Sequence, residues 1–347
     1  MLPWAPWCAR VTTPINRRTA SLTRPPPPDR RRSERRRLRK PTTLRPCADL
    51  PSQHVDSPAL TRPLHVQHSR SATLYALGAI ASWALLAALG VALKHVPPFL
   101  LTGIALVVGS VPTWPLVARR PGLWKIPLGT LALGVTGLFG FHFLLFLALR
   151  SAPPVQANLV NYLWPLFIVV LSPLLLPGMV LRPVHLIAAL LGFAGAAVAI
   201  LGRSQDVGGG WSWGYLLALA SALVWACYSL LTRRVKPFPT VAVGLFGLVS
   251  GVLSLLCHAL LEPATTLGSR DWLLLGVAGL GPLGTAFLLW DKALKLGDPR
   301  QIGILSYLTP LSSTVVLMLT GAGPLSWSIA LAAAMIIGAA IIGARAR

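Results

Sequence analysis

Ten blocks of apolar residues, each about 20 residues long, limit what this chain can fold into. A helix of about 20 residues spans the roughly 30 Å hydrocarbon core of a bilayer, and barrel-type alternation is absent. Because lipid offers the backbone no hydrogen-bond partners, each block is expected to be a transmembrane helix. The composition agrees, since 54% of residues are hydrophobic and only 12% are charged. The expected spans are 73–93, 98–118, 126–149, 155–177, 183–202, 212–232, 239–261, 272–292, 300–320 and 325–344.

Residues 1–72 form a basic tail of different composition, with 15 of the 31 Lys and Arg residues and only 4 acidic residues. Four consecutive Pro residues and the run RRRSERRRLRK leave too few aliphatic residues to fold, so disorder is expected. The tail is interpreted as a solvated extension or as translated upstream sequence. The alternative is an arm that binds nucleic acid or anionic lipid, and of these partners nucleic acid is not expected. No apolar region typical of a signal peptide precedes the first span.

Four Cys residues occur without a CxxC motif, two in the tail and two in spans, at Cys8, Cys47, Cys227 and Cys257. Their spacing indicates neither a disulfide framework nor a zinc site, and buried thiols are the expected state. No metal site and no cofactor are therefore expected.

Basic residues are distributed unevenly between the loops on the two sides of the membrane. With the N-terminus in the cytoplasm, the cytoplasmic loops and C-terminus hold twelve Lys and Arg residues, against four in the external loops. Positive charge is retained on the cytoplasmic side, so both termini are predicted to be cytoplasmic in a bacterial inner membrane.

An internal repeat relates the two halves of the chain. Residues 146–166 align with residues 291–311 at a shift of 145, with eight identities in 21 positions, including Gln156, Tyr162 and Pro165. A repeat of five spans, an odd number, places the second copy upside down relative to the first. Inverted repeats of this kind are a transporter architecture, with the substrate site between the copies near the midplane. The expected domains are a first repeat at 73–203 and a second at 211–345.

The motifs VNYLWPL (160–166), VWACYSLLTRR (224–234) and SYLTPLSS (306–313), with GPLS (323–326), resemble the drug/metabolite transporter superfamily, EamA type. The similarity is greatest to the bacterial exporters of aromatic amino acids, and it covers about residues 73–345. It implies a helical bundle around a central cavity and export of small metabolites. The basic tail departs from the family pattern.

The fourth span carries a polar stripe. Asn158, Asn161, Tyr162 and Pro165 lie at helical spacing on one face, whereas Trp164 is expected to point away. The stripe is interpreted as the lining of a cavity, or else as hydrogen bonding between helices. Pro165 and its repeat counterpart Pro310 are predicted kinks and gating bends. On this basis Trp164→Ala is expected to impair transport less than Tyr162→Ala.

Aromatic and ionisable residues within spans supply the other candidate substrate contacts. An aromatic cavity binds planar side chains by stacking and an ammonium group by cation–π attraction, although each residue alone also fits a packing role. The complete candidate set is Trp83, His142, Asn158, Tyr162, Trp225, Tyr228, Trp290 and Tyr307. Trp211, Trp213, Trp272 and Trp327 are interpreted as interfacial anchors.

Charged groups in or near the spans are expected to have mainly structural roles. Asp291 and Lys295 are predicted to form an interfacial ion pair, with gating as the alternative, and Arg150 and His258 to extend toward the outer rim. Since no carboxylate is expected at mid-membrane, either His142 carries protons or transport follows the substrate gradient.

The sequence therefore predicts a monomeric secondary transporter that works by alternating access. The expected substrates are aromatic or other neutral amino acids, and a drug or other metabolite is the alternative cargo. A membrane-embedded enzyme would need clustered nucleophiles, bases or metal ligands, which are absent from the motifs. A scaffold that binds without transporting is the third class.

Overall fold

The computed structural model describes residues 70–201, 211–319 and 327–345, and within them every regular element is helical. Ten segments are long and apolar enough to cross a membrane, as the sequence predicts. They are numbered here as spans 1 to 10: Arg70–Ala92, Pro98–Arg119, Leu128–Ser151, Pro154–Leu175, Pro183–Leu201, Gly214–Leu231, Ala242–Leu261, Ser269–Leu296, Pro299–Leu319 and Trp327–Arg345. The first turn of span 1 includes residues 70–72, which the sequence assigns to the tail. The rest of the predicted tail lies outside the described residues.

Five spans consist of a single helix and five are divided. The single helices are α1 (Arg70–Ala92), α8 (Pro183–Leu201), α9 (Gly214–Leu231), α10 (Ala242–Leu261) and α15 (Trp327–Arg345). The divided spans contain α2 (Pro98–Ser110), η1 (Val111–Thr113) and α3 (Trp114–Arg119); α4 (Leu128–Val135), η3 (Thr136–Gly140) and α5 (Phe141–Ser151); α6 (Pro154–Asn161) and α7 (Trp164–Leu175); α11 (Ser269–Leu280), η4 (Gly281–Thr285) and α12 (Ala286–Leu296); and α13 (Pro299–Leu305) and α14 (Leu308–Leu319). A short helix, η2 (Pro121–Trp124), precedes span 3.

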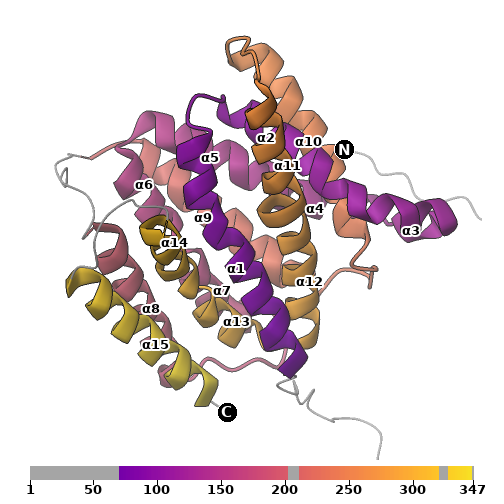
Figure 1. Cartoon of the computed structure of the whole chain (residues 1–347). Helices are drawn as coiled ribbons and strands as arrows, with labels where there is room; N and C mark the ends of the chain where they lie inside the picture. The colour runs from indigo at the N-terminus through magenta and orange to yellow at the C-terminus, as the bar shows by residue number, and fades with distance from the viewer. Residues whose placement is uncertain (1–69, 202–210, 320–326, 346–347) are drawn as a thin grey trace, which may run out of the picture. The chain divides into compact units, whose positions relative to one another are not determined.

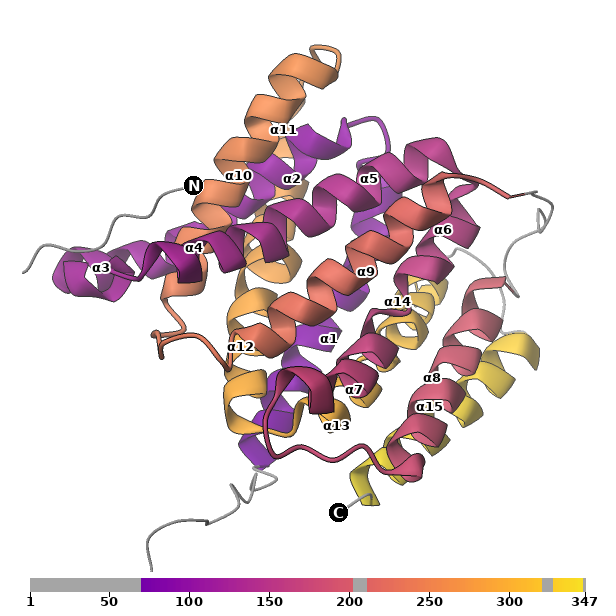
Figure 2. The same ribbon diagram turned by 180° about the vertical axis from the view of Figure 1, so that it is seen from behind.

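The helix contacts have the two-fold symmetry that the repeat predicts. Helix α1 of span 1 packs against α12 and α14 of the second repeat, and α9 of span 6 packs against α5 and α7 of the first (Figures 1 and 2). The pairs α2 with α10 and α8 with α15 join equivalent spans of the two copies, and α8 and α15 lie side by side in both views. The contacts that the first repeat makes with the second therefore have the same pattern as those that the second makes with the first.

Breaks in the helices occur at equivalent positions of the two repeats. The π-helices η3 and η4 lie 145 residues apart, and the interruptions that follow Asn161 in span 4 and Leu305 in span 9 lie 144 residues apart. Pro165 and Pro310 lie in the first turn of the second halves of these spans, where a Pro lacks the N–H that would bond four residues back. The predicted kinks are thus complete interruptions of the helix.

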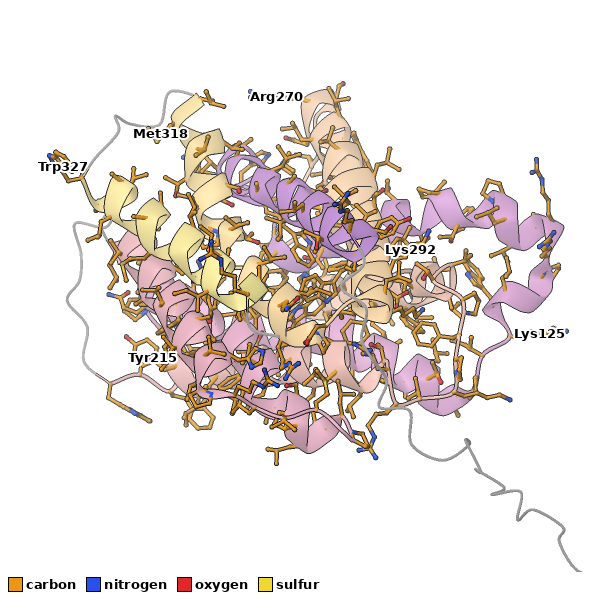
Figure 3. All side chains as sticks on the ribbon, turned by 90° about the horizontal axis from the view of Figure 1, so that it is seen from below. Lys125, Tyr215, Arg270, Lys292, Met318 and Trp327 are labelled. Atoms are coloured by element: carbon orange, nitrogen blue, oxygen red, sulfur yellow. The ribbon has the colours of Figure 1, made fainter. Side chains whose placement is uncertain are left out.

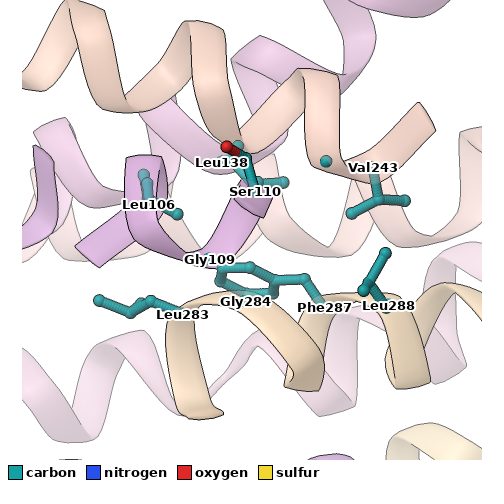
Figure 4. Close-up of a pocket in the computed structure, with 11 residues that line it drawn as sticks. Leu106, Gly109, Ser110, Leu138, Val243, Leu283, Gly284, Phe287 and Leu288 are labelled. Atoms are coloured by element: carbon teal, nitrogen blue, oxygen red, sulfur yellow. The ribbon is translucent and has the colours of Figure 1, made fainter. Parts of the chain in front are cut away.

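Glycine allows close contact between the repeats at the π-helices. A methyl group on Gly137 would lie 2.2 Å from the Tyr228 ring, and one on Gly109 would lie 2.7 Å from the Cα of Gly284. Figure 4 shows the second contact, where Leu106 and Phe287 leave only a small gap of about 10 Å³. Tight helix packing of this type depends on small residues.

Tryptophans expected at the membrane interfaces are exposed on the helix bundle. Trp327 is 90% exposed, and its side chain extends away from the helices in Figure 3. Trp211, Trp213 and Trp272 are also exposed. Their exposure agrees with the interpretation as interfacial anchors.

Candidate functional site

A cavity of about 730 Å³ lies between the two repeats. Its walls come from spans 1 to 6 and from spans 8 and 9. It reaches the end of the bundle where Lys94 and Arg150 lie, which we call the mouth face. At the opposite end, which we call the closed face, Asp291 is buried and does not line the cavity. The structure thus has a hollow that opens toward one face.

Four tryptophans lie together at the inner end of the cavity, and we call Trp83, Trp164, Trp225 and Trp290 the tryptophan cluster; all but Trp290 line the cavity. Every pair of these rings lies between 5.3 and 6.4 Å apart by centroid, mostly edge to face. The Trp83 indole donates to the Pro282 carbonyl at 3.0 Å, and the Trp290 indole donates to the Ser229 hydroxyl at 3.1 Å. These hydrogen bonds hold two of the rings in place, so the cavity ends on a rigid aromatic surface.

Phenylalanine side chains extend this aromatic surface. The ring of Phe287 lies 6.1 Å from Trp83 and 5.6 Å from Trp225, and the ring of Phe141 lies 5.3 Å from Trp225. Both residues line the cavity. Sequence reasoning missed them because a Phe facing a cavity looks the same in the sequence as one facing lipid.

Polar side chains occupy another part of the wall. His142 Nδ1 lies 2.6 Å from the Leu138 carbonyl oxygen. Because a carbonyl only accepts, Nδ1 carries the hydrogen of this bond, and Nε2 is left for another partner. The cavity is also lined by Asn158, Asn161 and Thr309, and the side-chain oxygens of the last two have no hydrogen-bond partner among the described residues. This wall therefore places polar side chains next to a ligand in the cavity.

Six of the ten candidate residues line the cavity and four do not. The lining set is Trp83, His142, Asn158, Tyr162, Trp225 and Pro310. Trp290 lies behind the lining in the tryptophan cluster, and Tyr228 packs on Trp225 and Gly137. Tyr307 is fully buried against Gly192. Pro165 is buried at the start of α7. The symmetric pair Tyr162 and Tyr307 is thus divided between the cavity and the core.

The predicted orientation of Trp164 is wrong. Trp164 lines the same cavity as Tyr162, and its ring contacts three other members of the tryptophan cluster. The prediction assumed one continuous helix through span 4. Because the helix is interrupted between Asn161 and Trp164, the two halves do not share one helical register.

Charged residues form one cluster at each face. At the mouth face the buried Glu262 carboxylate accepts from the backbone N–H groups of Phe99 and Leu100, and it contacts Arg150 at 2.7 Å and His258 at 3.0 Å. Arg150 and His258 therefore share an ion-pair network, rather than only extending to the rim as predicted.

At the closed face Asp291 accepts from Lys295 and from Thr240, each at 2.6 Å. The predicted ion pair of Asp291 and Lys295 is therefore confirmed, and its carboxylate is almost fully buried. Arg233 donates to the Gly297 carbonyl at 2.8 Å. Burial lowers the pKa of the Arg233 guanidinium, and the charge of Asp298 acts in the opposite direction.

Both halves of the chain match one protein family. Residues 70–201 and 212–344 each match the EamA-like transporter family, so the family model covers both repeats. The chain belongs to the EamA-like transporter family. This membership confirms the predicted superfamily. It also confirms that the protein is a transporter of the bacterial inner membrane and not an enzyme.

Curated relatives and a solved structure support the assignment of this chain to the EamA-like transporter family. It is 42% identical to the aromatic amino acid exporter YddG of Ancylobacter novellus over 277 residues, which cover 78% of this chain and 96% of that protein. The aromatic amino acid exporter YddG of Escherichia coli is 25% identical over 64% of this chain and 79% of that protein. A solved crystal structure with 40% sequence identity superposes with a TM-score of 0.74 and covers 78% of this chain and 95% of the other.

Proposed function

We propose that this EamA-family transporter exports aromatic amino acids. The observation that carries the proposal is the cavity of about 730 Å³ that ends on the tryptophan cluster. Its volume falls within the range of about 300–1,000 Å³ typical of small-molecule sites. Two relatives over most of whose length the chain aligns are exporters of this substrate class, which supports the same assignment here.

The two walls of the cavity match the two parts of an aromatic amino acid. Trp83, Trp164 and Trp225 offer faces and edges on which a planar side chain stacks. His142 and Tyr162 face the same cavity and offer polar atoms to the α-ammonium and α-carboxylate groups. A substrate with its ring on the tryptophans and its charged groups on the polar wall would satisfy both.

Alternating access between the repeats is the mechanism we propose, with the breaks before Pro165 and Pro310 as the bends at which spans 4 and 9 move. We also propose that both termini are cytoplasmic, on the basis of the excess of basic residues in the loops of that side. The mouth face is then external and the structure is in an outward-open state. Because one chain encloses the whole cavity, the transporting unit is a monomer.

Counterflow in proteoliposomes loaded with unlabelled phenylalanine tests this function. We expect saturable entry of labelled phenylalanine that tyrosine and tryptophan inhibit and glutamate does not. Comparing runs with and without a pH gradient shows whether protons are coupled. The alternative function, export of drugs, is supported by the apolar character of most of the cavity lining. Inhibition of counterflow by an organic cation drug but not by tyrosine would favour this alternative.

A further inference from the structure

The two faces of the protein carry equivalent cations in different surroundings. In the alignment of the two repeats, which is shifted by 145 residues, Arg150 at the end of span 3 corresponds to Lys295 at the end of span 8. The Arg150 side chain is 43% exposed and lines the cavity at its mouth, whereas the Lys295 side chain is 25% exposed and lies outside the cavity. This difference marks which face is open.

Lys295 joins span 8 to the loop that precedes span 7. Its Nζ donates to Asp291 at 2.6 Å and to the Phe238 carbonyl at 3.0 Å, and it lies 3.8 Å from the centroid of the Phe238 ring. Thr240, in the same loop, donates to the same carboxylate oxygen, Asp291 Oδ2, at 2.6 Å. The corresponding cation of the mouth face, Arg150, lies farther from its ring, at 5.7 Å from Phe99.

The group of contacts around Asp291 and Lys295 is also joined to the inner end of the cavity, through consecutive residues of α12. Trp290 belongs to the tryptophan cluster, and Asp291 follows it in α12. A movement of α12 that displaces the Trp290 ring must therefore also displace the Asp291 carboxylate. Changes at the substrate cavity and at the closed face are coupled by a rigid helix segment.

We propose that Asp291, Lys295, Thr240 and Phe238 form a latch that holds the closed face shut, and that this latch breaks each time the cavity opens there. In an inverted-repeat transporter the second state exchanges the conformations of the two repeats, so Lys295 takes up the exposed position that Arg150 occupies now. The inference depends on alternating access and not on the identity of the substrate.

Repeat symmetry also supplies a reporter for the opening of this face. Leu317 lines the cavity near its mouth, and its counterpart 145 residues earlier, Ser172, is fully buried in α7. A thiol at Ser172→Cys reacts with a water-soluble reagent only when the closed face opens. The reaction rate is then proportional to the population of that state, if opening and closing are faster than modification.

The experiment measures modification of Ser172→Cys in a chain without the four native cysteines, held in nanodiscs so that both faces meet the reagent. We expect Lys295→Met, which keeps the apolar stem and removes the charge, to raise the rate about tenfold, the change that roughly 1.4 kcal/mol produces. Asp291→Asn should act in the same direction, and Lys295→Arg should restore most of the wild-type rate.

Lys292→Met is the matched control. Lys292 lies on the same helix, and its ammonium group lies 4.9 Å from the Tyr75 ring outside the latch. Its removal should leave the modification rate unchanged. An unchanged rate in Lys295→Met, with a native thermal midpoint, would overturn the latch, as would an equal rise in Lys292→Met. A loss of fold would appear as a lowered midpoint, and Asp291→Asn and Lys295→Arg then decide the question. Since no substrate is added, the absence of phenylalanine transport would refute the proposed function and leave this result intact.

Discussion

Replacing Trp164 with Ala should impair this transporter more than replacing Tyr162 with Ala. Trp164 is only 6% exposed, and its ring lies 5.5 to 6.4 Å from three other rings of the tryptophan cluster. Tyr162 lines the cavity but contributes no ring to that cluster. The two residues lie two positions apart in one span, which makes them a matched pair.

The ring contacts set the expected size of the effect. Aromatic pairs contribute about 0.5–1.5 kcal/mol each, so three lost pairs lower the free energy of unfolding by about 1.5–4.5 kcal/mol. Loss of one stacking surface for the substrate raises the KM for phenylalanine by about 2- to 10-fold, on the same energy per pair. Tyr162→Ala loses none of the cluster contacts and should keep a thermal midpoint close to that of the wild type.

Thermal unfolding in detergent and counterflow at matched reconstitution measure the two effects. Trp164→Phe keeps an aromatic ring and should fall between the wild type and Trp164→Ala in both assays. If Trp164→Ala keeps both the thermal midpoint and the KM of the wild type, the tryptophan cluster is neither a structural nor a binding surface and the reasoning fails.

Two further changes test the packing and charge contacts. Glu262→Gln removes the charge that holds Arg150 and caps α2, and it should lower the free energy of unfolding by about 1–3 kcal/mol, as measured by thermal or chemical unfolding; an unchanged midpoint would show that the network is not stabilising. Gly137→Ala places a methyl group 2.2 Å from the Tyr228 ring and should lower the folded yield, whereas Gly129→Ala, with no atom within 4 Å, should behave like the wild type. Equal yields in size-exclusion chromatography would contradict the close contact.

The fold was largely predictable because its signals are local or repeat along the chain. Apolar length defines the ten spans, and Pro165 and Pro310 mark the two breaks by removing a backbone donor. Two-fold symmetry also relates the contacts that α1 makes with the second repeat to those that α9 makes with the first.

The site was only partly predictable because it depends on conformation and on distant contacts. Tyr162 and Tyr307 are equivalent in sequence, yet one lines the cavity and the other packs on Gly192, because only one face is open. Asp291 is buried by Thr240, which lies 51 residues away in the chain. The orientation of Trp164 follows from the break in span 4, and helical spacing alone does not give it.

Substrate protection of a thiol in the cavity wall tests most directly whether the substrate passes through this cavity. Ser313 lines the cavity in α14, so Ser313→Cys in the cysteine-free chain should react with a water-soluble reagent at the mouth face. We predict that phenylalanine slows this reaction, with half-maximal protection near its KM for counterflow, and that glutamate has no effect. Saturable phenylalanine counterflow with no protection of this thiol would show that the substrate takes another path and would contradict the account.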